Sequence, residues 1–192
     1  MTRRICVAYG FTVLLCSSVS AQAASANSSK IETAGTFVAI ALPLTAGGIA
    51  LWKDDWTGVK QLTTVTVLTV GTVFVLKHLV RECRPFAHPC TPGGSNWDSF
   101  PSDTAALGFA PAGFLWHRYG WEYGLPAYAA AEFVGYSRVD AKKHHWWDVV
   151  ASTAISIGYN EMITTRFHPS RSLYTSLDAS QDGVYASLHY TF

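Results

Sequence analysis

Two long apolar segments constrain the fold of this chain more than any other feature of its sequence. The first, Thr33 to Trp52, has no charged residue and matches the roughly 20 residues that a helix needs to cross a bilayer. The second, Val59 to Val80, is rich in threonine and valine, which favour strands. It is too long for a typical strand, so its length predicts a second helix.

Three shorter apolar segments begin near Thr104, Gly124 and Trp146. They fit membrane helices packed by small residues, and they also fit buried helices of a soluble bundle. Together with the long segments, they predict an all-α bundle of about five to six helices. We expect this bundle to be associated with a membrane.

The C-terminal residues 171–192 differ from the rest because apolar and polar residues alternate there. The dipeptide Asp182-Gly183 is typical of a turn, so this tail predicts a β-hairpin. A stripe ending in a C-terminal Phe resembles the last strand of an outer-membrane barrel, but the chain lacks the repeated segments of a whole barrel. We therefore expect the hairpin to pack on the helices or on a membrane surface. Its apolar face would consist of Val184, Ala186, Leu188, Tyr190 and Phe192.

The N-terminus is typical of an export signal. Arg3 and Arg4 precede an apolar run, and Ala21 and Ala23 form the small-x-small pattern of a signal peptidase site. We expect cleavage near Ala23, and an uncleaved signal anchor is the alternative. The predicted organisation is a signal peptide over residues 1–23, a helical domain over residues 24–170 and the tail over residues 171–192. A polar linker over residues 25–30 would open the helical domain.

Composition excludes two classes of protein. Only 14% of the residues are charged and 49% are hydrophobic, so most of the chain is not intrinsically disordered. The formal net charge of +1 gives no argument for a nucleic-acid partner.

Once the signal is removed, Cys83 and Cys90 remain. Two cysteines so close together in an exported chain predict a disulfide, with unpaired thiols as the alternative.

A group of cations precedes a proline. Lys77 and Arg84 are seven residues apart, which is two helical turns, and Arg81 lies between them on nearly the same face. Pro85 disfavours helix at Arg84, so we expect the helix to end there. Cations at a helix end suit a phosphate, which arginine binds through its planar fork. The alternative is a set of interfacial charges at the end of a membrane helix.

A second anion-binding element is expected at Ser102, which follows Pro101 and precedes an apolar helix. Backbone N–H groups at such a helix start are free to bind an anion. The alternative is an ordinary cap formed by Ser102, Asp103 or Thr104.

A histidine and an aspartate form the third element. His144 and Asp148 are four residues apart and share one face if a helix begins near His144. The carboxylate would accept a proton from one ring nitrogen and leave a lone pair on the other. A surface pair is the alternative. We expect His145 to point away from this face, while Trp146 and Trp147 fit either a membrane interface or the core.

Helix topology brings the three elements together. If neighbouring helices alternate in direction, the end of the second helix and the start of the third lie at one end of the bundle. The end of the fourth helix and the start of the fifth lie at the same end. The sequence therefore predicts one site at this end, built from cations, a helix start and a histidine.

The combined pattern resembles the type 2 phosphatidic acid phosphatase (PAP2) superfamily, whose three motifs read K-x6-RP, PSGH and SR-x5-H-x3-D. The first motif is complete from Lys77 to Arg84-Pro85, and the third is complete from Ser137-Arg138 through His144 to Asp148. The resemblance covers residues 76–150.

The resemblance implies a PAP2-like helical bundle and a reaction. His144 would attack phosphorus and form a phosphohistidine, and Asp148 would orient its ring. No metal or other cofactor is implied, because the cations supply the charge stabilisation that a metal would otherwise give. The residues implied to bind the phosphate are Lys77, Arg84, Ser102 and Arg138.

The second motif departs from the family pattern, because Thr104 replaces the histidine that protonates the leaving alkoxide. Losing a general acid costs about 10²–10⁴-fold in rate. A better leaving group, such as the phosphate of a lipid diphosphate, needs less protonation. Alternatively, Asp103, His145 or His88 replaces the acid. The third alternative is an impaired protein that binds phosphorylated lipid or has a structural role.

The apolar segments and the export signal point to a phosphorylated envelope lipid as the substrate and to an active site that faces the periplasm. A soluble periplasmic or outer-membrane location is the alternative. The oligomeric state is not predicted by the sequence.

Overall fold

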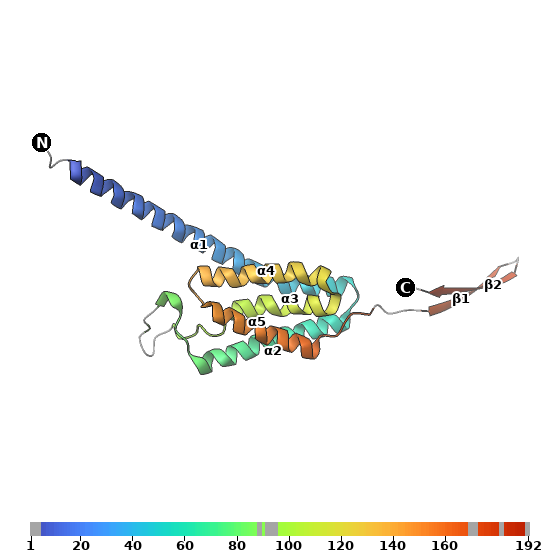
Figure 1. Cartoon of the computed structure of the whole chain (residues 1–192). Helices are drawn as coiled ribbons and strands as arrows, with labels where there is room; N and C mark the ends of the chain where they lie inside the picture. Colours follow the sequence, from blue (N-terminus) through green and yellow to red (C-terminus); the bar gives the residue numbers. More distant parts are fainter. Residues whose placement is uncertain (1–4, 88–89, 91–95, 169–172, 181–182, 191–192) are drawn as a thin grey trace.

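The computed structural model describes residues 5–87, 90, 96–168, 173–180 and 183–190 (Figure 1). Within these residues the chain forms five α-helices followed by a two-stranded antiparallel sheet. The predicted all-α bundle with a C-terminal hairpin is therefore confirmed. The elements are α1 (Ile5–Trp52), α2 (Trp56–Val80), the 3₁₀ turn η1 (Pro85–Ala87), α3 (Asp103–Tyr119), α4 (Trp121–Asp140), α5 (Trp146–Ile163), β1 (Leu173–Ser180) and β2 (Gly183–Tyr190).

α3 is the central helix of the bundle, and it contacts each of the other four helices (Figure 1). Its side chains Phe109 and Phe114 are fully buried, and alanines fill much of the space between the helices. Small residues allow the helices to approach closely. A Cβ atom added at Gly113 would lie 2.4 Å from the Asn160 side chain of α5, and one added at Gly35 of α1 would lie 1.9 Å from the Ser137 hydroxyl of α4.

Two helix boundaries differ from the predictions. The expected linker at residues 25–30 is helical and continuous with the rest of α1, because no glycine or proline interrupts residues 11–34. α2 ends at Val80 and not at Arg84, since Arg81 adopts a left-handed conformation with φ of 53°. Lys77 and Arg84 therefore do not lie on one helical face.

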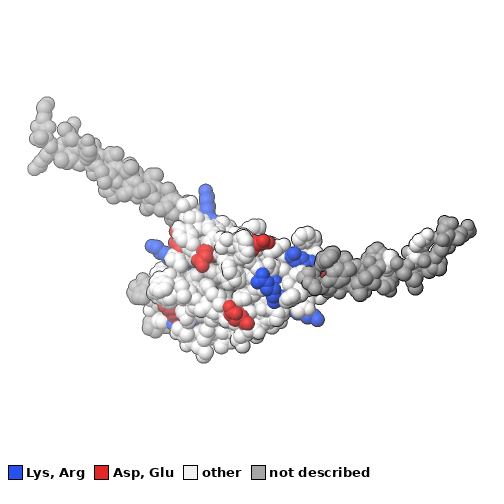
Figure 2. Space-filling model, turned by 45° about the vertical axis from the view of Figure 1, so that its right-hand side comes forward, with Lys and Arg blue, Asp and Glu red and all other residues white. Residues whose placement is uncertain are grey.

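α1 and α2 carry the membrane-like character of the chain. Residues 27–52 and 56–87 are long and apolar enough to cross a membrane. Large side chains such as Phe37, Leu44 and Phe74 are exposed on these two helices. Figure 2 shows a face of the molecule on which charged side chains are few and scattered. Such a surface suits contact with lipid.

The predicted C-terminal hairpin is present, with Leu173 opposite Tyr190 and Ser180 opposite Gly183. Its two strands hydrogen-bond to each other, and Figure 1 places them away from the helices. Packing on the helical body is therefore not found, and packing on a membrane surface stays a prediction. Asp182 and Phe192 lie outside the described residues.

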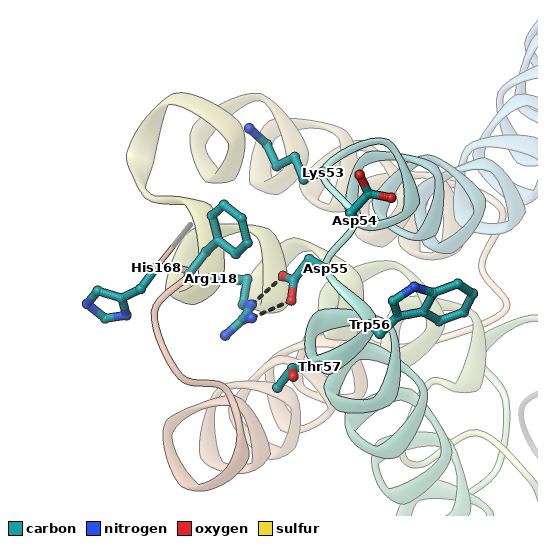
Figure 3. A pocket seen from close by; sticks show the side chains of 8 residues that line it. Lys53, Asp54, Asp55, Trp56, Thr57, Arg118 and His168 are labelled. Carbon is teal, nitrogen blue, oxygen red and sulfur yellow. Dashed lines mark hydrogen bonds and ion pairs between the residues drawn. The ribbon is translucent and has the colours of Figure 1, made fainter. Parts of the chain in front are cut away.

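A buried ion pair joins three segments at the end of the bundle where α2 begins (Figure 3). Asp55 caps α2 by accepting the Gly58 N–H at 2.8 Å, and it receives both the Nε and Nη2 groups of Arg118 from α3. Arg118 also donates to the backbone oxygen of Thr165, after α5, at 2.7 Å. Burial opposes the charge on Asp55, but hydrogen bonds from Arg118, Gly58 and Tyr119 outweigh it and hold the pKa of Asp55 below its ordinary value.

We expect Asp55→Asn to lower the free energy of unfolding by about 3–5 kcal/mol, because it leaves the Arg118 guanidinium buried without a counter-charge. Since the folded-state pKa of Asp55 is depressed, the stabilisation by the pair is present at neutral pH and lost as the pH falls below about 4. Thermal unfolding of the full chain in detergent at several pH values measures both effects. The matched control is Asp54→Asn, because Asp54 is exposed and its positive φ is tolerated by asparagine. Equal stability of the two variants would contradict the assigned role of the pair.

Candidate active site

The predicted site residues lie at the other end of the bundle, around the N-terminus of α3. Lys77 comes from the last turn of α2, Arg138 from the last turn of α4, and His144 from the loop before α5. Asp103, the first residue of α3, lies between two of them: its Oδ1 is 3.7 Å from Lys77 Nζ and 3.9 Å from His144 Nε2. The alternating helix directions thus bring together residues from distant parts of the sequence.

His144 is almost completely buried, with 3% of its side chain exposed. Its Nδ1 lies 2.8 Å from the backbone oxygen of Ser99. A carbonyl oxygen only accepts hydrogen bonds, so we assign the ring proton to Nδ1. The neutral ring then has its lone pair on Nε2, the nitrogen on the side of Asp103. A buried imidazole in this tautomer is suited to nucleophilic attack.

Asp148 supports this histidine less directly than predicted. Its Oδ2 is 3.4 Å from His144 Nδ1, which is longer than the bond from that nitrogen to the Ser99 carbonyl. Oδ2 accepts shorter hydrogen bonds from the Ser99 hydroxyl at 2.5 Å and from the His145 N–H at 2.9 Å. The reason for the difference is local: α5 begins at Trp146, so His144 precedes the helix and does not share its face with Asp148.

The Asp148 carboxylate is nevertheless kept ionised. Burial alone would raise its pKa, but hydrogen bonds from His144, Ser99 and the His145 backbone hold the pKa of Asp148 below its ordinary value. The site therefore has a fixed negative charge behind the His144 ring.

Arg84 is already paired within the chain. Its Nε and Nη2 groups donate to the two oxygens of Asp98 at 2.7 and 2.8 Å, a two-pronged arrangement that a phosphate would also accept. Hydrogen bonds from Arg84 outweigh the effect of burial and lower the pKa of Asp98. Lys77 Nζ donates to the backbone oxygen of the same aspartate at 2.6 Å.

Arg138 is held by α1. Its guanidinium donates to the backbone oxygen of Glu32 and, at 3.1 Å, to the Thr36 hydroxyl. The Glu32 carboxylate also pairs with Lys143, so one acidic residue contacts two cations of the loop region. The backbone oxygen of Arg138 accepts the N–H groups of Lys143 and His144, which connects the arginine directly to the histidine loop.

Ser102 is a buried helix cap. Its hydroxyl accepts the Ala105 N–H, and its own N–H donates to the Asp148 backbone oxygen. These contacts match the ordinary helix cap, which was the alternative to an anion-binding site at Ser102. They also place the start of α3 beside α5. Thr104 is the second residue of α3 and is partly exposed.

The three candidates for the missing acid differ in position. Asp103 is the candidate whose carboxylate faces His144 Nε2. His145 is the N-cap residue of α5. Its ring stacks on Trp147, with 4.3 Å between the ring centroids. Its Nδ1 faces the carboxylates of Glu82 and Asp148. Trp147 is exposed, so it lies outside the core. His88 lies outside the described residues.

The predicted disulfide between Cys83 and Cys90 is confirmed. It closes part of the loop that contains Arg84, and the Arg84 N–H donates to the backbone oxygen of Asn96 in the same loop. The disulfide therefore restricts the segment that supplies one of the cations.

Three residues of the site were missed by reasoning from the sequence: Asp98, Ser99 and Glu32. The first two lie just before Pro101, and their proximity to Ser102 is the signal that could have drawn attention to them. Glu32 offers no comparable signal, because it comes from α1, more than a hundred residues before Arg138.

The site thus combines a buried histidine, which has its lone pair on Nε2, with one lysine and two arginines at one end of a helical bundle. The chain belongs to the PAP2 superfamily, whose family model matches residues 58–169. It is therefore a phosphoric ester or diphosphate hydrolase of the PAP2 type.

Two known proteins are similar to the chain. A lipid A 4'-phosphatase of Helicobacter pylori (strain J99 / ATCC 700824) is 31% identical over 150 residues, which are 74% of this chain and 74% of that protein. The crystal structure of Aquifex aeolicus LpxE is 22% identical, with a TM-score of 0.49, and the match covers 66% of this chain and 83% of that chain.

We expect Ser99→Ala to lower phosphatase activity by about tenfold, because it removes a hydrogen bond to the charged Asp148. Losing this donor would raise the pKa of Asp148, which the Ser99 hydroxyl helps to hold down. Activity that needs the ionised carboxylate should therefore be lost at a higher pH on the acidic limb of the pH–rate profile. The control is Ser156→Ala, which removes a buried hydroxyl that bonds to the Ser152 backbone oxygen. An unchanged profile in the Ser99 variant would show that its hydroxyl does not act on this pair.

Proposed function

We propose that this protein is an envelope lipid phosphatase that hydrolyses a phosphate monoester or diphosphate through a phosphohistidine at His144. The observation that carries the proposal is the His144 ring: its Nδ1 is bound by a backbone carbonyl, and its Nε2 lies 3.9 Å from Asp103 and hence near Lys77. Nε2 would attack phosphorus, the bond to the leaving oxygen would break, and water would then release phosphate from the ring.

Cations would stabilise the charge on the transferred group. The start of α3 is surrounded by three cationic side chains, those of Lys77, Arg84 and Arg138. Their positive charges are sufficient for each step of the proposed phosphoryl transfer. Arg84 would exchange Asp98 for phosphate oxygens, since both present two acceptors to its planar fork. Arg138 would keep its contact with α1 and act from its fixed position.

The leaving group must depart without the histidine that the family places at residue 104. The phosphate of a diphosphate leaves without a general acid, which makes a lipid diphosphate a favoured substrate. For a monoester, Asp103 is the candidate acid, because its carboxylate lies at the start of α3 in the region where the phosphoryl group would bind. It would have to carry a proton when the alkoxide leaves.

Three observations support a phosphorylated lipid as the substrate. α1 and α2 contain the two segments that could span a membrane. Trp146 and Trp147 are exposed next to His144, where an interface would place aromatic rings. The relative from H. pylori is a lipid A 4'-phosphatase, so lipid A and related envelope lipids are the first substrates to test.

The length of α1 supports signal cleavage and a site on the exported side. A helix of 48 residues is about 72 Å long, more than twice the hydrocarbon thickness of a bilayer. Residues 5–16 and 27–52 therefore cannot both cross a membrane within one straight helix. Cleavage near Ala23 would leave residues 27–52 as the first span. The new N-terminus would then lie on the exported side, at the end of the bundle where Glu32 contacts Arg138.

We expect His144→Ala to abolish phosphate release from every substrate in a panel of lipid monophosphates and diphosphates that includes lipid A. Quenching with alkaline denaturant during turnover, which preserves a phosphohistidine, should trap phosphate on the wild-type chain and not on this variant. His117→Gln is the control, because it changes a histidine at the opposite end of α3. Release that survives in His144→Ala would disprove the phosphohistidine mechanism.

We expect Thr104→His to raise the rate on monoesters by about 10²–10⁴-fold and the rate on diphosphates much less, since only the alkoxide needs an acid. Comparing the two substrate classes in wild type and variant measures this difference. If the wild type releases no phosphate from any substrate and Thr104→His restores release, the protein is a phosphate-binding relative silenced at this position. An equal gain on both classes would contradict our account of the missing acid.

A further inference from the structure

We propose that Glu82, His145 and Asp148 form a binding site for a divalent transition-metal cation such as Zn²⁺. Glu82 lies in the loop after α2, and the other two residues lie at the start of α5. Their ligand atoms are all within 4.8 Å of one another. The cation would tether the two segments.

Two of the separations between donor atoms are close to those around a small tetrahedral cation. His145 Nδ1 lies 3.5 Å from Glu82 Oε1 and 3.7 Å from Asp148 Oδ2. Zinc bonds of about 2.0–2.2 Å at tetrahedral angles place neighbouring ligands roughly 3.3–3.6 Å apart. Small side-chain movements would therefore bring all three residues into coordination distance.

Two polar atoms of this cluster are buried without a hydrogen-bond partner in the described part of the chain: His145 Nδ1 and Asp148 Oδ1. The Asp148 side chain is 0% exposed, so its unpartnered oxygen has no access to bulk water. An unpaired atom of a charged, buried group is costly. A cation bound by His145 Nδ1 would remove the cost of that atom, and it would reach Asp148 through Oδ2, the oxygen that lies 3.7 Å from Nδ1.

The surroundings orient the ligands. Trp147 Nε1 donates to Glu82 Oε1 at 2.8 Å, and the Trp147 ring stacks on His145 with an interplanar angle of 8°. The His145 N–H donates to Asp148. Outer contacts of this kind fix the positions of metal ligands and strengthen binding.

The ligand types indicate which cation would bind. Two carboxylates carry the two negative charges that balance a divalent ion, and an imidazole favours zinc and similar transition metals over Mg²⁺ and Ca²⁺. The alternative to a metal ion is a proton shared between Glu82 and Asp148. A metal-binding experiment distinguishes these two possibilities.

The test is isothermal titration of Zn²⁺ into the chelator-treated full chain, in detergent and in a phosphate-free buffer. We expect one site per chain and a rise in the thermal unfolding temperature on binding. Glu82→Gln and His145→Gln should each weaken binding at least about tenfold and reduce that rise, and Trp147→Phe should weaken it by about 10–100-fold. Mg²⁺ at the same concentration should give neither signal.

The matched controls are His117→Gln and Glu161→Gln, which change a histidine–carboxylate pair 3.6 Å apart at the other end of the bundle. These variants should bind Zn²⁺ as the wild type does. The proposal is overturned if the wild type binds no stoichiometric zinc, if Glu82→Gln and His145→Gln bind it unchanged, or if the control variants lose it equally. Because the experiment measures metal binding, its result does not depend on whether the chain releases phosphate.

Discussion

The hydrogen bonds to the buried carboxylate of Asp148 are the interactions on which the site depends. They join the loop before α3, through Ser99, to the start of α5, through His145. Ser99 then fixes the His144 ring with its backbone oxygen. An ionised group is expensive to bury, and several donors on one oxygen offset that expense. Removing one donor therefore affects the position of the nucleophile as well as the charge behind it.

Buried charge is used at both ends of the bundle for different purposes. At the end where α2 begins, Asp55 and Arg118 satisfy each other and hold α2, α3 and the segment after α5 together. At the active end the pairs are partly exposed, as the 56% exposed side chain of Asp103 beside Lys77 shows. The first arrangement is stable by itself, whereas the second can exchange a carboxylate for a phosphate. The bundle thus combines a fixed end with a reactive end.

The partners of the two arginines refine how a phosphate would bind. Arg84 meets a carboxylate with the same two-pronged geometry that a phosphate offers, so binding exchanges one anion for another. Arg138 is fixed by Glu32 and Thr36 of α1, so the first predicted membrane segment positions a cation of the third motif. Substrate affinity would then depend on the packing of α1 as well as on the motif residues themselves.

The sequence alone determined the helical class, the hairpin and the Cys83–Cys90 disulfide, because these follow from periodicity, composition and spacing. The motif residues were assigned through the resemblance to the PAP2 superfamily, and alternating helix directions predicted that they meet at one end of the bundle. It did not determine where α2 ends, since the left-handed turn at Arg81 depends on how the following loop packs. Only the tertiary structure decided that Ser99, and not Asp148, is the nearest acceptor for His144. That choice depends on contacts between segments about 45 residues apart, which no local pattern in the sequence records.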